Sequence, residues 1–256
     1  MLMANKYVNF VSDEHLLGCI QKLHEAYMRA KRNLSRKTFY ANKVDTIKLT
    51  FDAEFNSLNE NKLVQTEILR QIDKSINNSI GTFHEQVLGG IDGYEAGVLA
   101  GYDIKAKDNT LFAEVKNKHN TASSSTLEAI FQKLARLADD HKQAKCYWVQ
   151  ILAKSSFENL WSGDINSKEY SHSRVYRISG DKFYAKLSGQ DDAFFQLYSA
   201  LSQAIRDYLS TATAEQIESS NSAFDEIEKS ARSTKRSILD QVTFENFGYY
   251  LGFKGR

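Results

Sequence analysis

Apolar side chains recur at helical spacing over several long stretches of this chain. Residues 13–32 carry such a stripe, and Ser12 in front of it is a suitable N-cap. The same periodicity over residues 62–88 and 192–209 predicts two further helices. Residues 214–236 form a more polar stretch that also has helical character. Both ends of the chain are therefore expected to be mainly helical.

The middle of the chain has a different pattern. Residues 101–107 and 110–118 have strand character, and residues 146–152 are almost continuously apolar, as in a strand buried on both faces. Between them, Ser125 and Glu128 have capping-box spacing and predict the start of a helix. Two strands, a crossing helix and a buried strand indicate an α/β core.

The region after this core is expected to be rich in loops. Residues 155–173 show no clear periodicity, and residues 174–179 form a short predicted strand. We find no repeat, linker or low-complexity tract between the parts. The chain is therefore predicted to be one elaborated domain over residues 1–256.

One predicted hairpin in the core brings two acidic side chains together. If Asp108-Asn109 is a two-residue turn, at positions that tolerate positive φ, Asp103 lies directly opposite Glu114. Their Cβ atoms would then be about 5 Å apart. Lys116 projects from the same face of its strand as Glu114. The hairpin therefore predicts a cluster of two carboxylates and one ammonium group.

Two carboxylates this close repel each other unless a positive ion lies between them. Mg²⁺ is typically held by one or two carboxylates together with water and substrate phosphate. A lysine beside the metal can orient the water that attacks phosphorus and help to deprotonate it. The metal stabilises the charge that develops on the phosphate and the leaving oxygen. Asp103, Glu114 and Lys116 thus indicate phosphodiester hydrolysis.

Other interpretations of this segment stay open on the residues alone. The spacing also fits a rival frame of Asp92 with Asp103 and Lys105, although the centre of that hairpin falls at Gly97-Val98, which is not a polar turn. An exposed hairpin with a cross-strand charge pattern and no chemistry is the structural alternative.

The order of the elements and three short motifs resemble a known nuclease family. Phe83-His84-Glu85-Gln86-Val87-Leu88-Gly89 precedes Asp103, Glu114-Val115-Lys116-Asn117-Lys118 follows it, and Ile178-Ser179-Gly180-Asp181-Lys182-Phe183-Tyr184 comes later. Over most of the chain they resemble type II restriction endonucleases with the PD-(D/E)XK core, in particular the subgroup that cuts GGNCC-type sites. One departure is that Tyr102 stands where the family has a proline.

The resemblance implies a fold, a cofactor and a set of roles. The fold would be α/β, a mixed central sheet flanked by helices, with N- and C-terminal helical elaborations. Asp103 and Glu114 would bind Mg²⁺, for which Mn²⁺ can substitute, and Lys116 would be the catalytic lysine. Glu85 would be an auxiliary metal or water ligand. Within the single domain we expect a helical part at 1–88, a catalytic core at about 83–153 and a recognition and dimerisation part at about 154–256.

The charge balance conceals two basic regions. The chain has 33 Lys and Arg against 32 Asp and Glu, and this nearly neutral total by itself argues against a nucleic-acid partner. However, residues 29–48 carry a net charge of +6 and residues 168–186 one of +3. Basic groups concentrated in this way are candidates for contacts to phosphates and bases. The residues we expect to contact DNA are Arg32, Arg36, Lys37, Lys118, Arg174, Arg177 and Lys182.

The remaining expectations concern partners and location. The substrate would be double-stranded DNA with a short palindromic site, which implies a homodimer and a companion methyltransferase for the same site, not stably bound to the enzyme. A repair or recombination nuclease on the same core, or a non-enzymatic α/β interaction protein, are the alternatives. Two cysteines, no leader-like start and no long apolar run predict a cytoplasmic protein without a membrane segment.

Overall fold

The computed structural model describes residues 5–97, 101–118, 123–213 and 222–247. They form two compact units. The first is the described part of Met1–Leu23 and Ile80–Thr211, and the second that of His24–Ser79 and Ala212–Arg256. Within the described ranges, no helix is long and apolar enough to cross a membrane. Two helices supply residues to both units, and they are α1 (Asp13–Arg32) and α4 (Glu60–Gly89).

A six-stranded mixed sheet forms the centre of the first unit. Its strand order is β1-β2-β3-β4-β6-β5. Neighbouring strands are antiparallel except for β3 with β4 and β4 with β6, which are parallel. Because parallel neighbours need a crossover connection, β3 and β4 are joined through a helix, α5 (Ser124–Asp140). The strands are β1 (Tyr94–Ala96), β2 (Ile104–Ala106), β3 (Leu111–Lys118), β4 (Lys145–Leu152), β5 (Glu158–Ile165) and β6 (Lys168–Ser179).

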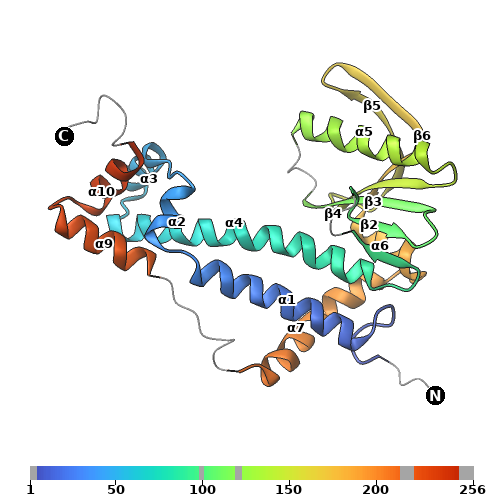
Figure 1. The fold of residues 1–256 in the computed structure, drawn as a ribbon, viewed down its shortest axis with the longest axis horizontal. Coiled ribbons are helices and arrows are strands. Elements are labelled where there is room, and N and C mark those ends of the chain that lie inside the picture. The colour runs from blue at the N-terminus through green and yellow to red at the C-terminus, as the bar shows by residue number, and fades with distance from the viewer. Residues whose placement is uncertain (1–4, 98–100, 119–122, 214–221, 248–256) are drawn as a thin grey trace. The chain divides into compact units, whose positions relative to one another are not determined.

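Helices cover both faces of this sheet (Figure 1). On one face, α5 buries Ile130, Phe131 and Leu134 in a cluster that includes Phe112 of β3 and Trp148 of β4. A second cluster lies on the other face, where it joins the sheet to helices from both ends of the unit. The strand β4 is apolar between Cys146 and Leu152 except for Gln150, because both of its faces are covered. The helices of the second face are the first part of α1, the end of α4, α6 (Gly180–Ser188) and α7 (Ala193–Thr211).

The second unit is helical and has its own core. Phe39, Val64, Ile68 and Ile227 are buried together in it. Two short helices begin within the basic region at residues 29–48, one capped by Ser35 and one by Asp45. Besides parts of α1 and α4, the unit contains α2 (Arg36–Ala41), α3 (Thr46–Asn56), α9 (Ala223–Ser233) and α10 (Ile238–Phe247).

Most of the elements expected from the sequence are confirmed. The fold is mixed α/β, with a sheet flanked by helices and helical regions before and after it in the chain. Helix α1 spans the predicted residues, and Ser12 caps it through a bond from the backbone N of His15 to its Oγ at 3.1 Å. Of the polar stretch expected to be helical, residues 214–221 lie outside the described ranges, and α9 occupies much of the remainder.

The start of α5 differs from the predicted capping box. The N-cap is Ser123, whose side chain accepts a hydrogen bond from the backbone N of Thr126. Glu128 instead accepts hydrogen bonds from Tyr170 and Asn166. Three consecutive serines offer equivalent hydroxyl groups here, so the spacing of Ser125 and Glu128 did not identify the one that caps the helix.

The predicted loop at residues 155–173 is wrong, because this region forms most of a β-hairpin. β5 and β6 pair antiparallel, and the turn residues Asn166 and Ser167 have φ of 52° and 61°. A two-residue hairpin turn of type I′ requires positive φ at both positions, and asparagine tolerates it. The strand β5 was not predicted because six of its eight residues are exposed, including Leu160, and only Trp161 and Ile165 are buried along it.

Replacing Ser167 by glycine is expected to stabilise the fold. A serine with a φ of 61° is strained by its Cβ, whereas glycine adopts this conformation freely. After the larger entropy loss of glycine on folding, a net gain of about 0.5 kcal/mol should remain. Urea unfolding should therefore show a higher midpoint for Ser167→Gly. The control Ser171→Gly, within β6, should lower the midpoint, and an unchanged or lower midpoint for Ser167→Gly would contradict the turn geometry.

Candidate active site

The hairpin of β2 and β3 places Asp103 opposite Glu114. Ile104 pairs with Ala113 in the antiparallel ladder. One step further, the backbone N of Asp103 donates to the carbonyl oxygen of Ala113 at 2.9 Å. The register therefore makes Asp103 the cross-strand neighbour of Glu114, as the sequence predicts.

The turn between these strands is held by its own polar residues. The backbone N of Asn109 donates to the carbonyl oxygen of Ala106 at 2.9 Å, and Asn109 has a φ of 60°. The Oδ1 atom of Asp108 accepts from the backbone N of Thr110 at 3.0 Å. Such local bonds are the reason that Asp and Asn favour turns, and here they fix the register that aligns the carboxylates.

Glu114 lies on the face of β3 that is covered by α5, and it is only 8% exposed. Its Oε1 accepts a hydrogen bond from Nζ of Lys116 at 2.8 Å, and its Oε2 accepts one from Nζ of Lys133 on α5. Burial alone would raise the pKa of Glu114, but the two lysines outweigh it and hold this pKa below its usual value. Glu114 is therefore ionised.

Asp103 is fixed by a backbone hydrogen bond and forms no salt bridge with a lysine among the residues that the structure describes. Its Oδ2 accepts a hydrogen bond from the backbone N of Val115 at 2.7 Å. Burial and the neighbouring Glu114 raise the pKa of Asp103, against the opposing effects of that bond and of Lys116 and Lys133. Asp103 is thus costlier to ionise than an exposed aspartate.

Glu85, near the end of α4, adds a third carboxyl group to this environment. Burial raises its pKa to about 7, and the charge of Asp103 contributes in the same direction. Lys116 opposes this effect. A carboxyl group that is costly to ionise beside two others is typical of a site that receives a cation.

The donor set suits a hard divalent cation. Two facing carboxylates are what proteins offer to Mg²⁺, with water and substrate phosphate as the other ligands. Among the residues that the structure describes, no group of three or more His, Cys, Asp or Glu side chains is arranged to hold a metal ion. Two facing carboxylates fit Mg²⁺, because this ion keeps several water and substrate ligands when it is bound to protein.

Comparison with known proteins decides the family. The family model of Eco47II restriction endonucleases matches residues 8–210. The chain is 38% identical over 254 residues to the type II restriction enzyme Sau96I of Staphylococcus aureus, covering 96% of this chain and 97% of that protein. It is 30% identical over 222 residues to the type II restriction enzyme Eco47II of Escherichia coli, covering 82% and 91%. The chain belongs to the Eco47II restriction endonuclease family.

This restriction enzyme is a site-specific deoxyribonuclease, so it acts on DNA. The similarity to restriction endonucleases predicted from the motifs is confirmed, and the alternatives of a repair nuclease and a non-enzymatic protein are excluded. The range of the chain that the family model covers contains Glu85, Asp103, Glu114 and Lys116.

Two further polar residues of the enzyme, Lys133 and Gln150, lie at this site, although the sequence patterns did not predict them as site residues. Lys133 lies one turn after the start of the buried stripe of α5, in a sequence position typical of a solvated helix face. Gln150 on β4 is the parallel partner of Lys116 and is only 8% exposed. A glutamine inside the apolar run at residues 146–152 was the available signal for Gln150.

The predicted DNA-contacting residues of the first unit have different surroundings. Lys118 is exposed, two residues beyond Lys116 on the same strand. Glu114 of β3 pairs with Trp148 of β4, and Trp148 pairs with Arg177 of β6, so the three residues lie in one row across the sheet. The buried Nε of Arg177 has no hydrogen-bond partner among the described residues. Lys182 is exposed in the first turn of α6, whereas Nη1 of Arg174 donates to the carbonyl oxygens of His141 and Lys142 at the end of α5.

The other three predicted contacts, Arg32, Arg36 and Lys37, belong to the second unit. Arg36 forms an ion pair with Glu245 of α10, while Arg32 and Lys37 are exposed.

The residues of the rival metal frame, Asp92 with Asp103 and Lys105, do not form a cluster. Asp92 is exposed and accepts a bond from the backbone N of Gly93, and Lys105 is paired with Glu95 at 3.1 Å.

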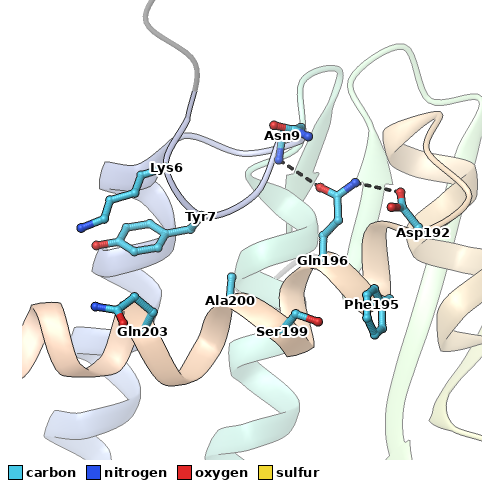
Figure 2. A pocket seen from close by; sticks show the side chains of 9 residues that line it. All are labelled: Lys6, Tyr7, Asn9, Asp192, Phe195, Gln196, Ser199, Ala200 and Gln203. Carbon is cyan, nitrogen blue, oxygen red and sulfur yellow. Dashed lines mark hydrogen bonds between the residues drawn. The ribbon is translucent and has the colours of Figure 1, made fainter.

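A shallow pocket of about 490 Å³ lies elsewhere in the first unit, between the N-terminal segment and α7 (Figure 2). Gln196 spans its upper part, accepting from the backbone N of Asn9 at 3.2 Å and donating to Asp192 at 2.8 Å. Lys6 at its edge is paired with Asp207. None of the residues that line it belongs to the carboxylate cluster, so we do not assign catalysis to this pocket.

His84, beside Glu85, predicts how acid will affect the stability of the enzyme. Burial lowers its pKa to about 4, and its Nδ1 lies 2.9 Å from the hydroxyl oxygen of Tyr184. Between that pH and the ordinary histidine pKa of about 6.5, the unfolded chain binds more protons than the folded one, so stability falls as the pH falls. Between pH 7 and pH 5, the titration of His84 should lower the free energy of unfolding by about 2 kcal/mol. Urea titrations of the metal-free enzyme at several pH values measure this decrease.

The matched variant is His84→Asn, which cannot titrate in this range. Its free energy of unfolding at pH 7 is expected to be lower, but the further decrease down to pH 5 should be smaller than in the wild type. An equal decrease in both proteins would show that His84 is not held in its neutral form.

Proposed function

We propose that this restriction enzyme hydrolyses both strands of DNA in a Mg²⁺-dependent reaction at a short palindromic site of the GGNCC type. The observation that carries the proposal is the register of β2 and β3, which sets Asp103 opposite Glu114 with Lys116 on the same face. Membership of the Eco47II family supports it, because the family is one of type II restriction endonucleases.

The chain's own residues would divide the chemical work. Asp103 and Glu114 would hold Mg²⁺, for which Mn²⁺ can substitute, and Glu85 would assist as a further metal or water ligand. The metal, when bound, would supply positive charge to the phosphate and the leaving oxygen. The fixed backbone bond to Asp103 and the lysines on Glu114 orient the two carboxylates before DNA arrives.

Lys116 would orient the attacking water and help to remove its proton. Burial favours the neutral amine, but the hydrogen bond to Glu114 outweighs burial and raises the pKa of Lys116. While it is bonded to Glu114, this lysine is therefore an ammonium group and a hydrogen-bond donor. It could accept a proton only once the Glu114 carboxylate is engaged by another cation.

Recognition of a palindrome would require two copies of the chain related by a two-fold axis, so we propose a homodimer. The predicted DNA contacts remain Arg32, Arg36, Lys37, Lys118, Arg174, Arg177 and Lys182. The Nε of Arg177 has no hydrogen-bond partner in the part of the chain that the structure describes. The part from residue 154 onward would carry recognition and dimerisation. A companion methyltransferase would protect the same sites in the cytoplasm, without a stable complex.

Digestion of a plasmid of known sequence tests the proposed specificity. With purified enzyme and Mg²⁺, we expect discrete fragments whose sequenced ends all fall within GGNCC-type sites. Discrete fragments ending at another palindrome would correct the recognition sequence alone. A continuous smear would contradict site-specific cleavage.

A further inference from the structure

The carboxylate of Glu114 is occupied on both of its oxygens in this structure. Nζ of Lys116 contacts Oε1, and Nζ of Lys133 contacts Oε2. The side chain of Glu114 is 10% exposed, and each lysine side chain is 33% exposed. Two ammonium groups with limited access to solvent therefore bind one proposed metal ligand.

Helix α5 determines where Lys133 lies. Its neighbours Ile130 and Leu134 are buried against the sheet, so the stem of Lys133 leaves the helix at the edge of this apolar face. By contrast, Gln132 and Arg136, on either side along the helix, are exposed. Lys133 is thus directed to the sheet by the packing of α5, and its ammonium group reaches the site from outside the Glu-x-Lys motif.

A cation on Glu114 would have to compete with these ammonium groups. Mg²⁺ binds oxygen at about 2.1 Å, a distance that leaves no room for an ammonium group on the same lone pair. Lys116 is held close by its position two residues away on the same strand. Lys133 has a flexible four-carbon stem from another element, so it is the group more easily displaced.

We propose that Lys133 is an exchangeable second lysine of the active site. It occupies Glu114 while the metal is absent, and its ammonium group moves to a non-bridging phosphate oxygen of the DNA when metal and DNA are bound. A lysine suits this exchange because its three donors and compact charge bind carboxylate and phosphate oxygens alike. The inference rests on the proposed function of the Asp103 and Glu114 site.

The test uses Lys133→Met, which keeps the apolar stem and removes the charge, with Arg136→Met on the next turn as the control. Titration calorimetry with Mn²⁺ alone should show binding about 3-fold tighter in Lys133→Met, because a competitor has been removed. For DNA binding in Ca²⁺, the slope of log Kd against the logarithm of the salt concentration should be smaller by about one in Lys133→Met than in the wild type. Single-turnover cleavage should slow by about 10- to 100-fold.

The conservative variant Lys133→Arg, which retains a cation, should return both the Mn²⁺ affinity and the salt slope towards the wild-type values. Arg136→Met should match the wild type in Mn²⁺ affinity and in cleavage. A merely structural ion pair would behave differently, since its loss would leave Mn²⁺ binding unchanged or weaker. The inference would be overturned if folded Lys133→Met bound Mn²⁺ with unchanged or weaker affinity. It would also be overturned if this variant cleaved DNA within about 2-fold of the wild-type rate.

Failure of this inference can be distinguished from failure of the proposed function. If Glu114→Gln is inactive while Lys133→Met behaves as the wild type, only the role of Lys133 is wrong. If Glu114→Gln cleaves DNA normally, the site itself is wrong, and with it the exchange.

Discussion

Glu114→Gln is expected to reduce single-turnover cleavage of DNA by at least about 10³-fold, with little change in the fold. Glutamine has the same size as glutamate and retains one oxygen acceptor for Lys116, but it carries no charge to hold a metal ion. Asp103→Asn and Lys116→Met should have effects of similar size, because metal binding and water activation act as one unit.

The controls for this experiment come from the rival frame. Asp92→Asn and Lys105→Met change a carboxylate and a lysine that the structure keeps out of the cluster, and both variants should cleave as the wild type does. Circular dichroism and urea unfolding should show that the inactive variants are folded. Full activity in folded Glu114→Gln would remove the assignment of the site.

Removal of divalent cations is expected to have an equally large effect. With excess EDTA, cleavage should fall below detection, and added Mg²⁺ or Mn²⁺ should restore it. The reason is that three carboxyl groups lie beside two lysines, and burial and neighbouring carboxylates make Asp103 and Glu85 costly to ionise unless a further cation is bound. Ca²⁺ prefers more ligands at longer distances, so it should support DNA binding with little cleavage.

A gel-shift assay in parallel separates the two functions of the metal. Binding to a cognate duplex should be stronger in Ca²⁺ than in EDTA, because the cation offsets repulsion between phosphate and carboxylates. Cleavage that persists at full rate in EDTA, after dialysis of the protein against the chelator, would contradict a metal-dependent mechanism.

The elements with one strong period could be predicted from the sequence. Helix α1 and the buried strand β4 gave clear patterns because one has a single apolar stripe and the other is covered on both faces. The hairpin of β5 and β6 could not be predicted, since Trp161 and Ile165 are its only buried positions on the first strand. Strands that expose most of their side chains lack the alternation on which such prediction depends.

The geometry of the candidate site was predictable where it depends on local chain direction. The turn is not the predicted two-residue turn at Asp108-Asn109, because the bond from the backbone N of Asn109 to the carbonyl oxygen of Ala106 places Lys107 and Asp108 at its centre. The register is nevertheless the predicted one, so Asp103 and Glu114 could be paired from their spacing. Lys133 and Gln150 come from elements that meet β3 only through tertiary packing. No spacing along the chain encodes that meeting, which explains why both were missed.

The most direct test of the central account is a crystal structure of the enzyme with a cognate duplex and Mn²⁺, with the metal located by anomalous scattering. The account predicts a Mn²⁺ peak coordinated by carboxylate oxygens of both Asp103 and Glu114, with a DNA phosphate oxygen among the other ligands. A Mn²⁺ ion at the scissile phosphate that is coordinated by neither Asp103 nor Glu114 would contradict the account.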